Sequence, residues 1–80
     1  VDQFNVKPNV YPNPFNKILQ VDVQIESKYS FIDITGKIIE TGNLHSGHNS
    51  IATNHLSNGT YWLEIKTQNA VHRSKVVKMD

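Results

Sequence analysis

Hydrophobic and polar residues alternate along two stretches of the chain. Between residues 17 and 26 every second position from Leu19 is apolar, namely Leu19, Val21, Val23 and Ile25. Between residues 60 and 67 the same period puts Tyr61, Leu63 and Ile65 on one face and Trp62 on the other. A period of two is typical of a strand with one buried face. We therefore predict β-strands over residues 17–26 and 60–67.

Turn-forming residues divide the rest of the chain into shorter apolar segments. The strands predicted there lie near residues 10–11 and at residues 29–34, 38–41, 48–53 and 71–79. Pro12 and Pro14 end the first of them, because proline has no amide hydrogen to donate to a sheet. Gly36 can adopt the left-handed conformation of a tight turn, so the strands before and after it are predicted to form a hairpin. Residues 42–47, which begin and end with glycine, are predicted to be a loop.

Seven short strands with frequent turn signals predict an all-β fold, a seven-stranded antiparallel immunoglobulin-like β-sandwich. The apolar residues agree with this prediction, since sixteen of the thirty are Val or Ile and only seven are Leu, Ala or Met. Such β-branched side chains favour strands. The spacing Leu56-x-x-Gly59-x-Tyr61 predicts a corner before the penultimate strand. There the Tyr61 ring would enter the core and its hydroxyl would bond back to the backbone.

Composition and charge exclude several classes of function. Eighty residues are enough for one domain with a single small core. The net charge of +1 is too small for electrostatic capture of nucleic acid, and no apolar run approaches the roughly 20 residues of a membrane-spanning helix. Without cysteine, neither a disulfide framework nor a zinc ribbon can form. We expect a monomer that binds no nucleic acid and inserts in no membrane, with any export signal upstream in a longer precursor.

Four histidines are the strongest candidates for a metal site. His45 and His48 form an H-x-x-H pair, and His55 and His72 follow. Imidazole is a common metal ligand, but no cysteine accompanies the pair and a glycine-flanked loop offers no rigid support. Exposed loop histidines are the favoured interpretation. There is also no nucleophile elbow and no pair of carboxylates beside an apolar pocket, so we expect no enzyme and no catalytic, metal-binding or cofactor-binding residues.

Several motifs, in order along about 70 of the 80 residues, together resemble one known family. They are Val10-Tyr11-Pro12-Asn13-Pro14-Phe15-Asn16, Ile32-Asp33-Ile34-Thr35-Gly36-Lys37-Ile38-Ile39, Gly47-His48-Asn49-Ser50-Ile51, Leu56-Ser57-Asn58-Gly59-Thr60-Tyr61 and Lys75-Val76-Val77-Lys78. Each motif alone is common turn or strand chemistry. In this order the set resembles the type A C-terminal sorting domain of the type IX secretion system, also called the Por secretion tail.

The resemblance implies a folded address on a secreted precursor from Bacteroidota. Residues 10–80 would be the sorting domain, which directs the cargo from the periplasm across the outer membrane. Residues 1–9 would be a linker that carries or follows the processing site. In this family a sortase-like peptidase commonly removes the domain, and the cargo then stays on the cell surface or is released. The implied partners are the fused upstream cargo, the outer-membrane translocon, and shuttle or sortase proteins.

The resemblance implies roles for two groups of residues. The candidates for recognition by the translocon lie in the last predicted strand: Lys75, Val76, Val77 and Lys78. The motif residues expected to act through the shape that they set are Pro12, Asn13, Pro14, Asp33, Gly36, Leu56, Gly59 and Tyr61. Lysine on a terminal strand can equally guard against edge-to-edge pairing of sheets. Both interpretations of Lys75 and Lys78 stay open.

The alternative function, from a different class, is an accessory β-sandwich that binds carbohydrate or spaces domains in a secreted hydrolase or adhesin. Position separates the two, because an address domain must end the precursor, whereas an accessory module can lie anywhere. Trp62 does not decide between them. An exposed Trp can stack on a sugar ring or anchor a protein interface, and its cross-strand neighbours can also shield it.

Overall fold

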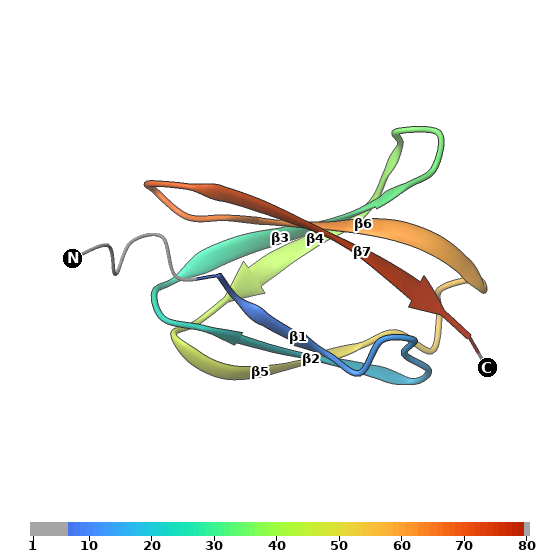
Figure 1. Ribbon diagram of the computed structural model, residues 1–80, viewed down its shortest axis with the longest axis horizontal. Helices are drawn as coiled ribbons and strands as arrows, with labels where there is room; N and C mark the ends of the chain where they lie inside the picture. Colours follow the sequence, from blue (N-terminus) through green and yellow to red (C-terminus); the bar gives the residue numbers. More distant parts are fainter. Residues whose placement is uncertain (1–6, 80) are drawn as a thin grey trace.

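Seven antiparallel β-strands form two sheets that pack face to face in the computed structural model, which describes residues 7–79 (Figure 1). The strands are β1 (Asn9–Tyr11), β2 (Ile18–Val23), β3 (Ser27–Asp33), β4 (Ile38–Leu44), β5 (Gly47–Ala52), β6 (Gly59–Lys66) and β7 (Val71–Lys78). One sheet has the order β1-β2-β5 and the other the order β4-β3-β6-β7. The predicted seven-stranded β-sandwich is therefore confirmed. In the described part of the chain no helix is long and apolar enough to cross a membrane.

The fourth strand extends the larger sheet. In a constant-type immunoglobulin domain this strand joins the first sheet, whereas β4 here pairs with β3. The predicted hairpin of β3 and β4 is confirmed, and its tip projects beyond the sandwich (Figure 1). Gly36 at the tip has a φ angle of +91°, which is the left-handed conformation that the turn requires.

The core lies between the sheets and follows the alternation read from the sequence. The buried side chains of β6 are those predicted, Tyr61, Leu63 and Ile65. Trp62 between them faces outward with 40% of its surface exposed, also as predicted. Phe31 on β3 is fully buried at the centre of an aromatic cluster. Its ring centroid lies 6.3, 5.8 and 6.1 Å from those of Phe15, Tyr29 and Tyr61.

Strand β2 ends three residues earlier than predicted, at Val23 rather than Glu26. The chain bends after Val23 and crosses to the other sheet, where β3 begins at Ser27. In this crossing the Ser27 hydroxyl donates to the carbonyl oxygen of Ile25 at 2.8 Å. Because Ile25 continues the period of two, the sequence pattern conceals the end of the strand.

The predicted loop at residues 42–47 is wrong. Strand β4 continues to Leu44 and β5 begins at Gly47, so the chain crosses between the sheets in two residues. Gly42 is a strand residue opposite Tyr29 of β3. A Cβ atom at position 42 would lie 2.4 Å from Cε2 of the Tyr29 ring. The close approach of this ring, and not a turn, is what requires glycine there.

The buried Asn49 side chain stabilises the crossing from β4 to β5. Its Nδ2 donates to the His45 carbonyl oxygen at 2.9 Å, and its Oδ1 accepts the His45 N–H at 3.2 Å. Backbone groups that have left one sheet and not yet joined the other therefore have hydrogen-bond partners.

Candidate functional site at the C-terminal strand

The C-terminal strand β7 lies at an edge of the four-stranded sheet, and the segment between β1 and β2 pairs with its last residues. Figure 1 shows these two parts of the chain on the same side of the sandwich. The Phe15 N–H donates to the Val77 carbonyl oxygen at 2.9 Å, and the Met79 N–H donates to the Phe15 carbonyl oxygen at 2.8 Å. The beginning and the end of the domain are therefore joined at this edge.

The Asn13 side chain adds two hydrogen bonds to this pairing. Its Nδ2 donates to the Lys75 carbonyl oxygen at 3.1 Å, and its Oδ1 accepts the Val77 N–H at 3.0 Å. Pro12 and Pro14 on either side have no N–H to offer. The Asn13 amide therefore supplies the donor and the acceptor that a neighbouring strand would supply, and it covers this part of the sheet edge.

Phe15 anchors the same segment in the core. Its side chain is 1% exposed, and its ring packs against that of Phe31. Thr53 holds the next residues from the other sheet: its hydroxyl donates to the Asn16 carbonyl oxygen at 3.0 Å, and its N–H donates to the Lys17 carbonyl oxygen at 2.8 Å. The segment thereby ties β7 of the larger sheet to the end of β5 in the smaller one.

The four candidate recognition residues divide between the two faces of β7. Val76 and Lys78 point into the sandwich, and each is 1% exposed. Lys75 is exposed and Val77 is half-buried on the opposite, outer face. A partner of the folded domain can therefore touch the side chains of Lys75 and Val77, but not those of Val76 and Lys78. The interpretation of Lys75 and Lys78 as guards of the sheet edge stays a prediction, since an inward-pointing charged residue can also oppose edge-to-edge pairing.

Asp33 holds the turn of the β3–β4 hairpin. Its Oδ1 accepts hydrogen bonds from the Thr35 hydroxyl at 2.6 Å and from the N–H groups of Thr35 and Lys37 at 2.9 and 3.0 Å. These bonds, with that of the Thr35 hydroxyl the strongest influence, hold the pKa of the Asp33 carboxyl below its ordinary value. The carboxylate is thus committed to the shape of the turn.

The predicted tyrosine corner is confirmed. Tyr61 is buried, and its hydroxyl donates to the Ser57 carbonyl oxygen at 2.6 Å. Leu56 is buried as well, and its N–H donates to the Thr53 carbonyl oxygen at 3.0 Å. Strand β6 then begins at Gly59. These contacts fix the connection through which the chain passes from the smaller sheet to the larger one.

Sequence reasoning missed the role of Glu40. Its Oε2 accepts a hydrogen bond from the Tyr29 hydroxyl at 2.9 Å, and its Oε1 pairs with Nε2 of His55. Burial first, and then the bond to the Glu40 carboxylate, raise the pKa of Tyr29 to about 12. The three residues come from β3, β4 and the β5–β6 connection, so no spacing along the chain signals the cluster.

The four histidines lie in separate surroundings. His48 on β5 has its Nδ1 2.7 Å from Oδ1 of Asp22, whereas His55 pairs with Glu40. His45 lies in the crossing from β4 to β5, and His72 lies on β7 opposite Ile65. Within residues 7–79 no group of three or more His, Asp or Glu side chains could hold a metal ion.

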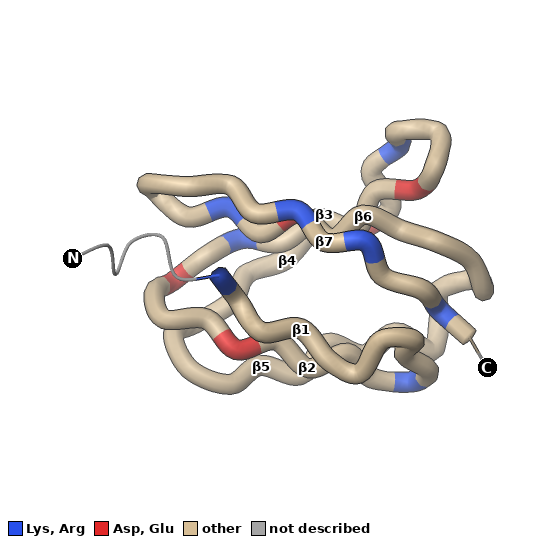
Figure 2. Tube along the Cα trace, in the orientation of Figure 1, with Lys and Arg blue, Asp and Glu red and all other residues tan. Residues whose placement is uncertain are grey.

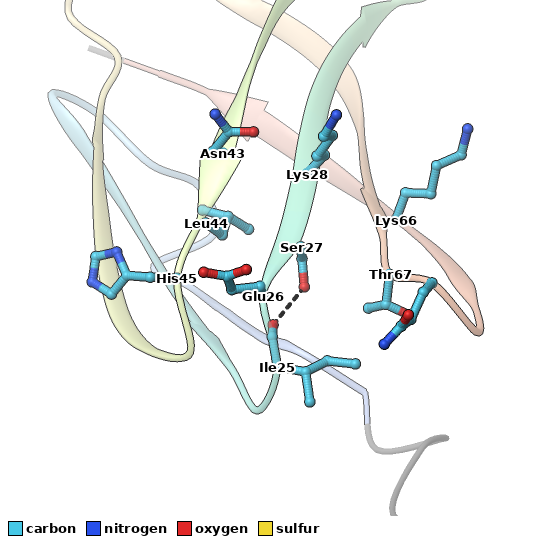
Figure 3. A pocket seen from close by; sticks show the side chains of 10 residues that line it. Ile25, Glu26, Ser27, Lys28, Asn43, Leu44, His45, Lys66 and Thr67 are labelled. Carbon is cyan, nitrogen blue, oxygen red and sulfur yellow. Dashed lines mark hydrogen bonds between the residues drawn. The ribbon is translucent and has the colours of Figure 1, made fainter.

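An open pocket lies at the end of the sandwich formed by the β2–β3, β4–β5 and β6–β7 connections (Figure 3). Its lining includes Ser27, whose hydroxyl is bonded to the Ile25 carbonyl oxygen. Figure 3 shows the His45 ring and Lys66 on opposite sides of the pocket. The Ser27 hydroxyl therefore donates to a backbone oxygen and not to a general base.

A comparison with known families gives a match over nearly the whole described chain. A family model described as the secretion system C-terminal sorting domain matches residues 9–79. The match begins at the first residue of β1 and covers all seven strands, including the segment that pairs with β7. A comparison with curated protein sequences found no match.

Proposed function

The chain belongs to the family of secretion-system C-terminal sorting domains, and on this basis we propose that it directs a fused upstream cargo across the outer membrane through the type IX secretion system. A domain of this family is a sorting signal without catalytic function. It is fused to its cargo and interacts with secretion machinery, and the protein that carries it is secreted or surface-bound. The finer steps are part of the proposal: the outer-membrane translocon reads the domain, and a sortase-like peptidase then removes it.

The observation that carries this proposal is the match over both segments that pair at the edge of β7. Asn13 contributes two of the hydrogen bonds between them, and the backbone of Phe15 takes part in two more. The pairing holds the outward side chains Lys75 and Val77 at a fixed place on the surface. A folded signal needs such a preorganised surface, because ordering it only on binding would weaken recognition.

The proposed route places the domain in the periplasm during transit and the protein on the cell surface or outside the cell afterwards. The proposed partners are the translocon and the shuttle or sortase proteins, with the cargo fused upstream of the domain. Processing would occur within or before residues 1–9, of which residues 1–6 lie outside the described residues. Asn9 pairs with Asp22 in β2, so a cut before Asn9 would leave the sheet intact.

The test of the proposal is export of a reporter. All 80 residues, fused to the C-terminus of a reporter behind a standard signal peptide, should carry it out of a host that has the type IX system. The same reporter without the domain should stay in the periplasm. If the intact fusion is expressed and folded but also stays there, the sorting proposal is wrong and the accessory-module function replaces it.

A further inference from the structure

A row of side chains crosses the outer face of the four-stranded sheet. Ile38 on β4 lies opposite Ile32 on β3, just past a shift in the register of these two strands between Phe31 and Ile32. Ile32 lies opposite Trp62 on β6. Trp62 in turn lies opposite Lys75 on β7. Directly opposed residues of neighbouring strands project from the same face of a sheet. Because Phe31, the residue before Ile32, points into the core, the row projects away from it.

Two of the three apolar members of this row are exposed to solvent. Ile38 is 58% exposed and Trp62 is 40% exposed, while Ile32 is half-buried. Val77, which lies opposite Thr60, is a diagonal neighbour of Trp62 and extends the row along β7. We call Ile32, Ile38, Trp62 and Val77 the outer patch. Contiguous exposed apolar side chains on a small domain mark an interaction surface.

A basic side chain beside the outer patch lacks an ion-pair partner among residues 7–79. Lys75 is the exposed cross-strand neighbour of Trp62, and it takes part in no salt bridge within the described residues. Figure 2 shows further basic positions along β7, but Arg73 pairs with Glu64 and Lys78 is buried. A surface that covers the patch would therefore gain from carboxylates at its rim.

We propose that a protein of the outer-membrane secretion machinery binds the outer patch through an apolar surface with an acidic rim. The inference rests on the proposed function, since it names the partner surface of the same sorting domain. The patch joins the outward residues of the terminal strand to the β3–β4 hairpin, so one partner contacts both. A lipid surface fits less well, because recognition of anionic lipid takes clusters of about four to eight unpaired Lys or Arg. On this face Lys75 adjoins the patch, whereas Arg73 pairs with Glu64, and Lys28 and Lys66 lie opposite each other farther along the strands.

The first test makes the same substitution on the two outer faces. Ile38→Thr removes apolar surface from the outer patch, and Ile18→Thr does so on the outer face of the three-stranded sheet, where Ile18 is 46% exposed. In the reporter fusion, Ile38→Thr should lower the rate of export about tenfold, and Ile18→Thr should change it less than about twofold. Urea unfolding of the 80-residue chain checks that the two variants are equally folded.

The second test reverses a charge. Lys75→Glu should lower export about tenfold by repelling an acidic rim. Lys66→Glu is the control, because Lys66 is also exposed on the larger sheet but lies opposite Val71, far along β6 from Trp62. A photo-crosslinking residue at position 38 of the parent fusion should capture a component of the type IX machinery, and one at position 18 should not. Lys75→Glu should weaken the capture at position 38.

The outcomes separate this inference from the proposed function. If the parent fusion is not exported, the proposed function fails and the inference fails with it. If the parent is exported and Ile38→Thr is exported as well as Ile18→Thr, the inference alone is overturned. Crosslinking from position 38 to lipid or lipopolysaccharide would overturn it in favour of a membrane surface. Equal capture from positions 38 and 18 would overturn it as well.

Discussion

The two sheets of the sandwich present different faces to the solvent. On the three-stranded sheet the polar side chains bond to one another: Nδ1 of His48 lies 2.7 Å from Oδ1 of Asp22, and the Tyr11 hydroxyl donates to Asp22 at 3.2 Å. The Ser50 hydroxyl donates to Oε1 of Gln20 at 2.7 Å. The four-stranded sheet has one such pair, Arg73 with Glu64 at 2.9 Å, but its outer patch leaves neighbouring apolar side chains in water.

This difference shows where a partner gains most. Removal of apolar surface from water is favourable by about 25 cal/mol per Å². Covering polar groups that already bond to one another brings no such gain, and any of those bonds that is broken must be replaced. The outer face of the three-stranded sheet, where Ile18 is the exposed isoleucine, therefore offers a partner less than the outer patch does.

The inner faces differ as well. The three-stranded sheet contributes aliphatic side chains to the core, namely Leu19, Val21, Val23 and Ile51. The four-stranded sheet contributes Phe31, whose ring contacts those of Phe15, Tyr29 and Tyr61. Aromatic pairs of this kind add about 0.5–1.5 kcal/mol beyond the burial of their surface. We therefore expect the core to depend more strongly on the larger sheet.

Truncation of Phe31 should have the largest effect on stability. Phe31 is fully buried, and Phe31→Ala should lower the free energy of unfolding by about 3–5 kcal/mol through the cavity it leaves. Ile51→Ala is the comparison in the smaller sheet, where Ile51 is 6% exposed on the edge strand β5. We expect this change to cost about 2 kcal/mol, because the edge can relax around it. Urea unfolding measures both, and equal losses would contradict the difference between the inner faces.

The tyrosine corner, which connects one sheet to the other, should contribute less. Tyr61→Phe keeps the ring in the core and removes only the hydroxyl that donates to the Ser57 carbonyl oxygen at 2.6 Å. The free energy of unfolding should fall by about 1–2 kcal/mol, because a partly buried acceptor loses its partner. An unchanged denaturation midpoint would mean that the corner bond does not stabilise the junction of the sheets.

The sequence is sufficient to predict the features that depend on near neighbours along the chain. Strict alternation predicts the inward and outward residues of β6, and the spacing of Leu56, Gly59 and Tyr61 predicts the corner. Gly36 predicts the hairpin turn for the same reason. In each case the residues that determine the structure lie within a few positions of one another, so their order in the sequence contains the necessary information.

The features that sequence reasoning missed depend on distant segments. In the sequence Gly42 indicates a loop, and only the fold shows that the Tyr29 ring of the neighbouring strand lies over this residue. The Asn13 amide bonds to β7 across 62 and 64 positions of sequence, and no local pattern shows that contact. The burial of Lys78, in contrast, could have been predicted from the sequence. Lys78 and Val76 are two residues apart on one strand, so the period of two already places them on the same face.

The smallest effect that we predict concerns two tyrosines, one in each sheet, whose hydroxyls donate to carboxylates. In the larger sheet the Tyr29 hydroxyl donates to Glu40 at 2.9 Å, and in the smaller sheet the Tyr11 hydroxyl donates to Asp22 at 3.2 Å. Burial, followed by the bond to the carboxylate, raises the pKa of Tyr29 to about 12. The same causes raise the pKa of Tyr11, which lies exposed on the outer face.

The raised pKa of Tyr29 predicts a loss of stability at alkaline pH. In the unfolded chain its hydroxyl loses its proton near pH 10, whereas in the folded domain the proton stays until about pH 12. Between these values the folded state binds more protons, so the free energy of unfolding falls as the pH rises. A shift of two pKa units corresponds to about 2.7 kcal/mol, and solvent screening of the half-buried hydroxyl reduces the expected loss to about 1 kcal/mol. The loss is measured from urea unfolding midpoints between pH 10 and pH 12, for the parent, Tyr29→Phe and Tyr11→Phe. Tyr29→Phe should remove more of the alkaline slope than Tyr11→Phe, and equal slopes in the two variants would show that the larger sheet does not protect its tyrosine.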